Sequence, residues 1–301
     1  MDAIEELKFY KKVVDNQLEI FFDYKVEKMK KIDPCASYII NNLKEYTLRG
    51  GKRIRAALMC CGYSLFSDED PDEIIKGSIA FELIQSYLLI HDDIIDKDTL
   101  RRGGPTIHKI YENDYIAKYG HKGSEHFGMS MAIIIGDIAN HLANHAILKL
   151  DMPEERKIRA AIELNSIGHT TLIGEALDIL SGTKETLTEA ELMKIHKLKT
   201  SSYTFEKPLK VGAILAGADT KVQNILTEYA MPLGQAFQLQ DDILGLFGNE
   251  EQLGKPVGSD IREDKKTLLI IKALENARKD EKDMIRNALG NPDITEGTIE
   301  D

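Results

Sequence analysis

Cysteine and proline are scarce in this chain of 301 residues, and its 39 basic residues are outnumbered by 50 acidic ones. Its three cysteines are too few for a disulfide framework, so we expect them to be small buried residues. Eight prolines and scattered glycines leave little room for linkers, and we therefore predict a single domain over residues 1–301. A formal net charge of -11 argues against nucleic acid as the main partner.

Long apolar runs are also missing from the sequence. Residues 79–90 come nearest to an uncharged run that could cross a bilayer, but they contain Glu82 and Gln85. The start of the chain, from Met1 to Glu6, carries acids where a secretion signal has bases and an apolar run. We therefore expect a cytoplasmic protein without an integral membrane segment.

Apolar residues recur with a helical period along nearly the whole sequence, whereas the alternation typical of strands is not sustained. The breaks fall at glycine and proline clusters. This pattern predicts an all-α fold, a helical bundle with a site in its core that loops close. The predicted helices cover 2–31, 35–48, 52–66, 71–97, 106–118, 124–150, 153–181, 187–216, 220–247, 265–279 and 281–289.

Two pairs of adjacent aspartates stand on apolar helical stretches far apart in the sequence, Asp92-Asp93 and Asp241-Asp242. Asp96 lies four residues after Asp92, so both project from one helix face, with Asp93 at its edge. Crowded carboxylates repel one another, and a hard divalent cation relieves that repulsion. Mg²⁺ prefers oxygen ligands, commonly one or two carboxylates plus substrate phosphates. The pattern predicts magnesium ions at these five aspartates, on two helices that face each other around a phosphate.

Local basic runs indicate phosphate as the ligand of an otherwise acidic chain. One run is Lys52-Arg53-Ile54-Arg55 after a glycine pair, and another is Arg101-Arg102 just after the first aspartates. Metal ions alone could bind one diphosphate. A second anionic group, held by lysine and arginine without metal, would explain the remaining basic residues.

Taken in order, these motifs resemble those of the trans-isoprenyl diphosphate synthases, the short-chain polyprenyl synthases of the farnesyl and geranylgeranyl type. Any one motif is a weak signal, and an Asp-Asp-x-x-Asp run alone is more often a solvated helix face. At these spacings, and over nearly the whole chain, they are strong together. The motifs are Gly-Gly-Lys-x-x-Arg at 50–55, Asp-Asp-x-x-Asp at 92–96, Arg-Arg-Gly-x-Pro-Thr at 101–106, Gly136-Asp137, Gly174-Glu175-x-x-Asp178, Lys199-Thr200, Gln238-x-x-Asp241-Asp242 and Lys265.

The resemblance implies an isoprenoid synthase fold with a deep central cavity, usually in a homodimer. It implies condensation of isopentenyl diphosphate with an allylic diphosphate, namely dimethylallyl, geranyl or farnesyl diphosphate, assisted by Mg²⁺. It implies that ten residues surround the allylic diphosphate and the cation that develops from it. They are Asp92, Asp96, Asp241, Arg101, Lys199, Lys255, Thr200 and Gln238, with Asp93 and Asp242 in support. It assigns to isopentenyl diphosphate Lys52, Arg55, Gln85 and Arg102, and to substrate binding in general Lys265.

Residues one turn before the first acidic motif set product length in this family. A helical turn rises about 5.4 Å, which places Leu88 one turn below Asp92, with Tyr87 beside it and Ile84 deeper. A single aromatic at Tyr87, without an insertion in the acidic motif, resembles archaeal-type geranylgeranyl diphosphate synthases. We therefore expect mainly geranylgeranyl diphosphate, with Tyr87 as the cavity floor.

Three features depart from the family pattern. Gly245 stands where many members have a third aspartate, and Glu175 replaces a more usual glutamine. The residues from Asp293 onward are polar, and we expect the chain to lack a further C-terminal helix that members carry.

Several other functions are compatible with parts of this pattern. They are a farnesyl or longer-chain synthase, a class I terpene cyclase and a non-catalytic subunit of a heteromeric synthase. The two intact acidic motifs, together with Lys52, Arg55 and Arg102, weigh against the cyclase and the subunit.

Overall fold

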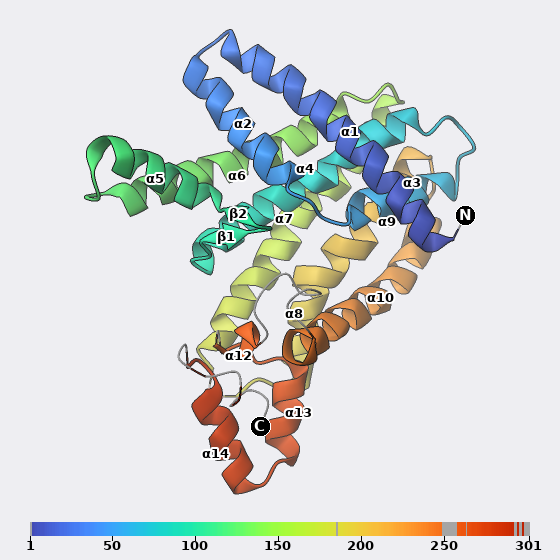
Figure 1. The fold of residues 1–301 in the computed structure, drawn as a ribbon. Coiled ribbons are helices and arrows are strands. Elements are labelled where there is room, and N and C mark those ends of the chain that lie inside the picture. Colours follow the sequence, from blue (N-terminus) through green and yellow to red (C-terminus); the bar gives the residue numbers. More distant parts are fainter. Residues whose placement is uncertain are drawn as a thin grey trace. The chain divides into compact units, whose positions relative to one another are not determined.

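The computed structural model describes residues 2–184, 186–248, 258–262, 264–291, 294 and 297. Within them, helices account for nearly all regular structure, so the predicted all-α fold is confirmed (Figure 1). The α-helices are α1 (Ala3–Lys30), α2 (Pro34–Leu48), α3 (Ile54–Ser64), α4 (Asp72–Ile95), α5 (Ile107–Tyr119), α6 (Ser124–Leu148), α7 (Glu154–Gly182), α8 (Glu189–His196), α9 (Lys207–Leu215), α10 (Thr220–Phe247), α12 (Ser259–Arg262), α13 (Leu268–Asn276) and α14 (Lys279–Ala288).

Contacts between residues divide the chain into two compact units. Unit 1 comprises Met1–Asn165 and Pro208–Gln223, and unit 2 comprises Ser166–Lys207 and Asn224–Asp301. The helices α7, α9 and α10 each contribute residues to both units. The single domain over 1–301 stays a prediction, and each unit is described by itself.

Helix α4 is the central helix of unit 1. It contacts α1, α2, α3, α5 and α6, and side chains such as Phe81, Leu83 and Ile90 are fully buried in this packing. Nearby, a Cβ atom added to Gly62 of α3 would lie 2.2 Å from the Leu209 carbonyl oxygen of α9. Because glycine has no side chain, these two helices meet backbone to backbone. The packing holds α4 in place, and α4 ends at the first acidic motif.

Helix α6 corrects one expectation from the sequence. In the described part of the chain, it is the one helix long and apolar enough to cross a membrane by length and composition alone. The prediction that residues 79–90 come nearest to such a span is therefore wrong. Within unit 1, however, α6 packs against α4 and α5 and carries Asp137, as a core helix of a globular protein can.

A short hairpin follows α4, which the sequence did not predict. Strand β1 (Leu100–Arg101) pairs antiparallel with β2 (Gly104–Pro105). The two residues between the strands, Arg102 and Gly103, have φ angles of 51° and 75°, as tight two-residue hairpin turns require. Strands of two residues are too short for an alternating pattern to appear, so the sequence indicated only a break.

The helix predicted over 187–216 consists of three elements: α8, a π-helix at Lys197–Glu206, and α9. Two glycines of unit 2 allow neighbouring helices to touch the π-helix backbone. A Cβ atom on Gly174 of α7 would lie 2.5 Å from the Lys199 nitrogen, and one on Gly234 of α10 would lie 2.5 Å from the Ser201 Cα. Because π-helices are rare and frequently mark functional sites, this element draws attention to Lys199-Thr200.

Candidate active site

The second aspartate of the first pair, Asp93, is buried and hydrogen-bonded inside unit 1. Tyr46 donates its hydroxyl to Asp93 Oδ2 over 2.7 Å, and Arg101 Nε donates to Oδ1 over 2.6 Å. Burial raises the pKa of Asp93, although the bond from Tyr46 and the charge of Arg101 act against that rise. Asp92 keeps 26% of its side chain exposed, against 1% for Asp93, and Asp96 is exposed. Asp92 and Asp96 therefore reach solvent, while Asp93 holds Arg101.

Arg101 lies among three carboxylates at the end of α4. Besides Asp93, its guanidinium contacts Asp98 at 2.7 Å and Asp92 at 3.4 Å. The β1–β2 hairpin turns the chain back, so that Arg101 reaches the helix that it has just left. A planar arginine fork held beside the partly exposed Asp92 and Asp98 suits a diphosphate, whose oxygens accept several hydrogen bonds at once.

The hairpin is joined to the glycine loop that opens the basic motif. Arg102 donates to the Gly50 carbonyl over 3.0 Å, and Arg49 donates to the Pro105 carbonyl over 2.5 Å. A Cβ atom on Gly51 would lie 3.3 Å from the Arg102 guanidinium, so the guanidinium packs closely against this glycine, whose φ of 111° also favours glycine. The two basic runs, far apart in the sequence, therefore meet in unit 1.

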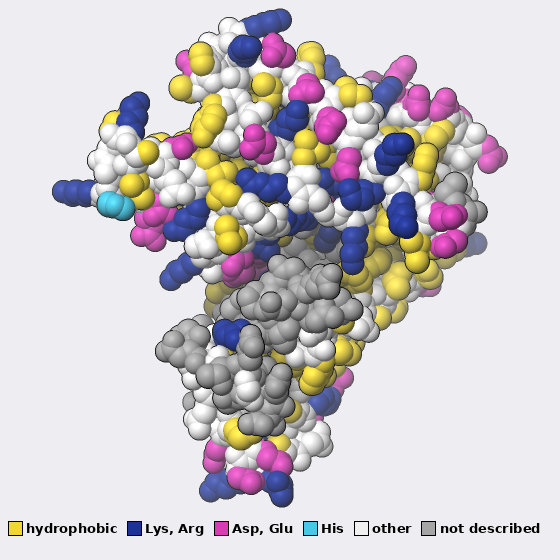
Figure 2. All heavy atoms as spheres, viewed as in Figure 1, with side chains coloured by type: hydrophobic (Ala, Val, Ile, Leu, Met, Phe, Trp, Pro, Cys, Tyr) yellow, Lys and Arg dark blue, Asp and Glu magenta, His cyan; other side chains and the backbone are white. Residues whose placement is uncertain are grey.

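The other residues predicted to bind isopentenyl diphosphate border the same loop and α4. Lys52 is exposed, Arg55 is half-buried at the start of α3, and Gln85 is half-buried on α4. On the face in view, lysine and arginine side chains gather over unit 1, although the chain as a whole is acidic (Figure 2). The structure thus joins Arg102 to the glycine loop that leads into Lys52, with Arg55 one turn further on.

Arg53 belongs to the basic run that indicated phosphate in the sequence, but in the structure it is buried and anchors this loop. Its side chain is 1% exposed and donates to Asp15 at 2.7 Å, to Glu82 at 2.8 Å and to the Thr47 carbonyl at 3.0 Å. The backbone φ of Arg53 is 55°, a conformation that costs energy in residues other than glycine and that surrounding contacts must hold. Its two carboxylate partners lie 38 and 29 residues away in the chain, so no local signal could reveal them.

Tyr87, the predicted floor, is 7% exposed and packs edge-on against His91, with ring centroids 4.9 Å apart. His91 in turn occupies the space beside Gly136 of α6, where a Cβ atom would lie 2.5 Å from its Nε2. Ile84 is buried and Leu88 half-buried. A chain of contacts from α6 through His91 thus fixes the Tyr87 ring. Gly136 of the Gly136-Asp137 motif leaves the space that the His91 ring occupies.

The second aspartate pair, in unit 2, repeats the asymmetry of the first. Asp242 is buried and accepts a hydrogen bond from Gln238 Nε2 over 2.9 Å, whereas Asp241 is exposed. Gln238 Oε1 accepts one from the Thr200 hydroxyl over 2.8 Å. His196 Nε2 lies 3.7 Å from Asp242 Oδ2 and was missed by sequence reasoning, although it stands only three residues before Lys199. Thr200, Gln238 and Asp242 therefore form one connected group.

Lys199 lies between two carboxylates of α7. Its Nζ is 2.7 Å from both Glu175 and Asp178, which are one helical turn apart. Burial alone would lower the pKa of Lys199, but the charges and hydrogen bonds of Asp178 and Glu175 outweigh burial and raise it. Gly174 makes this arrangement accessible, because a side chain there would collide with the Lys199 backbone.

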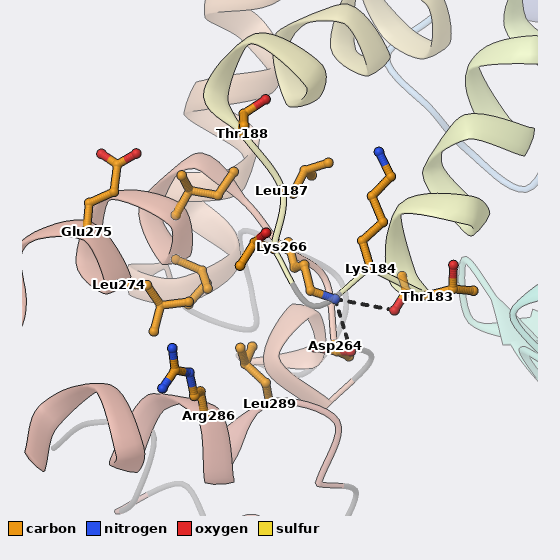
Figure 3. A pocket seen from close by; sticks show the side chains of 14 residues that line it. Thr183, Lys184, Leu187, Thr188, Asp264, Lys266, Leu274, Glu275, Arg286 and Leu289 are labelled. Carbon is orange, nitrogen blue, oxygen red and sulfur yellow. Dashed lines mark hydrogen bonds and ion pairs between the residues drawn. The ribbon is translucent and has the colours of Figure 1, made fainter. Parts of the chain in front are cut away.

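The remaining predicted lysines belong to the segment before α13. Lys255 lies outside the described residues, and Lys265 is half-buried. Next to it, Lys266 bonds Asp264 and the Gly182 carbonyl, each at 3.3 Å, on the wall of a pocket of about 750 Å³ (Figure 3). These bonds tie the segment that carries Lys265 to the end of α7.

Gly245, which replaces the usual third aspartate, is buried near the end of α10. Its carbonyl oxygen accepts a hydrogen bond from the Gly258 amide over 3.1 Å. The position therefore serves as a backbone contact for Gly258, the residue directly before α12.

The exposed aspartates fit magnesium by their chemistry. Carboxylate oxygens are the ligands that this ion prefers, and it commonly completes its shell with water and substrate phosphates. Among the described residues, no group of three or more His, Cys, Asp or Glu side chains could hold a metal ion alone.

Comparison with known proteins identifies the family. Residues 37–301 match the family model described as polyprenyl synthetase. The chain belongs to this family. It is 35% identical to a short chain isoprenyl diphosphate synthase of Methanocaldococcus jannaschii over 264 residues, which is 87% of this chain and 74% of the relative. It is 36% identical to a geranylgeranyl diphosphate synthase of Saccharolobus solfataricus, over 83% of this chain and 71% of the relative.

A solved structure of this family has the same fold. The crystal structure of geranylgeranyl pyrophosphate synthase from Corynebacterium glutamicum superposes with a TM-score of 0.88 at 30% identity, covering 97% of this chain and 84% of that one. Other matching relatives are named farnesyl or geranylfarnesyl diphosphate synthases. The predicted isoprenoid synthase fold and the assignment to the trans-isoprenyl diphosphate synthases are confirmed.

Proposed function

We propose that the protein is a prenyltransferase that condenses isopentenyl diphosphate with allylic diphosphates and makes mainly geranylgeranyl diphosphate. The observation that carries the proposal is the family match over residues 37–301, read with the two aspartate pairs that share one arrangement. In each pair the second carboxylate is buried and hydrogen-bonded, and the first is accessible.

In this proposal, Asp92, Asp96 and Asp241 bind magnesium on the allylic diphosphate, and Arg101 and Lys199 bind its oxygens. Magnesium, when bound, would draw negative charge onto the leaving diphosphate. Arginine and lysine stabilise the same charge as it develops.

The carbon left behind is an allylic cation, which needs an apolar surrounding with a few oriented dipoles and no water. The linked Thr200 hydroxyl and Gln238 amide supply such dipoles in unit 2.

Isopentenyl diphosphate would bind to Lys52, Arg55 and Arg102 without metal, with Gln85 as a further polar contact. The glycine loop supports this role. Arg102 donates a hydrogen bond to the backbone of this loop, and the neighbouring Arg53 is held by Glu82. After the isopentenyl double bond has attacked, a proton leaves, and the departing diphosphate would accept it.

The product assignment rests on Tyr87 and on relatives named geranylgeranyl diphosphate synthases. Relatives named geranylfarnesyl diphosphate synthases keep a longer product as the second candidate. We also propose that the protein is a cytoplasmic homodimer, and light scattering on purified protein would test the dimer.

The test is a product assay. Purified protein is mixed with magnesium, labelled isopentenyl diphosphate and each allylic starter in turn, and the dephosphorylated products are sized. Extension that ends at geranylgeranyl supports both the reaction and the role of Tyr87. Longer products would keep the reaction and reject the proposed floor, and no incorporation would reject the reaction.

A further inference from the structure

The contacts around Lys199 carry one inference that rests on the proposed function and refines it. Where the family more usually has glutamine, this chain has Glu175, and its carboxylate lies 2.7 Å from Lys199 Nζ. Asp178 lies at the same distance from the same nitrogen. With both carboxylates ionised and the lysine charged, the three side chains carry a formal charge of minus one.

This charge lies at Lys199, where the proposed function places the allylic diphosphate. The side chain of Lys199 is 30% exposed, that of Asp178 31% and that of Glu175 17%, so the group is open to a ligand. An anion that approaches Lys199 meets one cation and two anions, and like charges at such short range are costly when they are partly buried. Glutamine in place of Glu175 would leave the group neutral.

We infer that Glu175 is a positioning residue for Lys199 that makes allylic diphosphate binding depend steeply on magnesium. A bare diphosphate is repelled by the extra carboxylate, whereas a diphosphate whose charge is balanced by metal ions is not. The lysine is held between its two carboxylates until such a complex arrives, and the site thereby discriminates against diphosphates without metal.

The contacts explain why Glu175 acts through Lys199. Gly174 has no side chain that would keep α7 from the Lys199 backbone, so the lysine side chain lies within 2.7 Å of both Glu175 and Asp178. The π-helix around Lys199 also contacts α10 at Gly234, which restricts its movement away from α7.

The test compares the wild type with Glu175→Gln by calorimetric titration of an allylic thiodiphosphate, a probe that does not ionise. Affinity is measured from trace to saturating magnesium at constant ionic strength. We expect Glu175→Gln to bind the probe about tenfold more tightly at trace magnesium, with little change at saturation, because one repelling charge is gone. The magnesium dependence of binding should therefore become shallower.

Glu163→Gln is the matched control. Glu163 stands on the same helix with an 18% exposed side chain and pairs with Lys210 at 2.9 Å, but both belong to unit 1. Its substitution removes the same charge and should leave the magnesium dependence unchanged. Thermal melts of both variants confirm that the fold is intact.

The outcomes separate the inference from the proposed function. The same magnesium dependence in wild type and Glu175→Gln, or the same shift in Glu163→Gln, overturns the role of Glu175. No binding of the probe by the wild type at any magnesium concentration would instead reject the proposed function.

Discussion

Arg101 and Asp93 form a charged hydrogen bond of 2.6 Å at the end of α4, and Tyr46 donates a hydrogen bond to the other carboxylate oxygen of Asp93. Adjacent aspartates in one motif thus have different tasks. Asp93 holds the Arg101 guanidinium, while Asp92 remains partly exposed. In unit 2, Asp242 and Asp241 divide in the same way.

Asp93→Asn should therefore lower stability and weaken allylic diphosphate binding together. Loss of a charged, buried acceptor costs about 2 kcal/mol, and Arg101 loses its fixed position. Urea denaturation and steady-state kinetics measure both effects. Tyr46→Phe keeps the charge and should cost about 1 kcal/mol with a smaller rise in KM. Equal kinetic defects in both variants would contradict the role of Arg101.

Arg53→Ala and Arg55→Ala should separate structure from binding within one motif. Arg53→Ala leaves Glu82, with a 6% exposed side chain, buried without its partner, which costs about 3–5 kcal/mol. Arg55 is half-buried at the start of α3, so Arg55→Ala should change stability little and raise the KM for isopentenyl diphosphate. Denaturation midpoints and KM values check this division, and a destabilised Arg55→Ala would refute it.

Tyr87→Ala should lengthen the product. The buried ring is replaced by a cavity, which costs about 3 kcal/mol of stability and opens space beside His91. Chromatography of the dephosphorylated products measures chain length. Leu88→Ala, on the neighbouring half-buried position, is the control and should have the smaller effect. An unchanged product from Tyr87→Ala would show that the ring is not the floor.

Gly245→Asp, which restores the usual third aspartate, should impair the protein. Position 245 is buried and its carbonyl accepts the Gly258 amide, so a carboxylate there would be buried at a cost of at least about 2 kcal/mol. The melting temperature and turnover should both fall, and Gly245→Ala should be milder. A gain in activity from Gly245→Asp would mean that the site can accept a third carboxylate.

Periodicity predicted the helices well because each helix buries an apolar stripe that is legible over several turns. Periodicity could not reveal the π-helix at Lys197–Glu206, because its residue types are those of an ordinary α-helix. The motifs indicated Arg101 and Lys199 as binding residues. Tyr46, which donates to Asp93, and Glu175, which pairs with Lys199, come from distant segments, and only three-dimensional packing brings them to these residues.

The π-helix also constrains how this sequence can change. Each residue of an α-helix turns the chain by about 100°, so the number of residues in the wider turns around Lys199 sets the direction of each side chain in this element. Deleting one residue from Lys197–Glu206 would rotate Ser201 relative to Lys199, although both pack closely against glycines of unit 2, Gly234 of α10 and Gly174 of α7. Insertions and deletions should therefore be excluded from this stretch, even where single substitutions are tolerated.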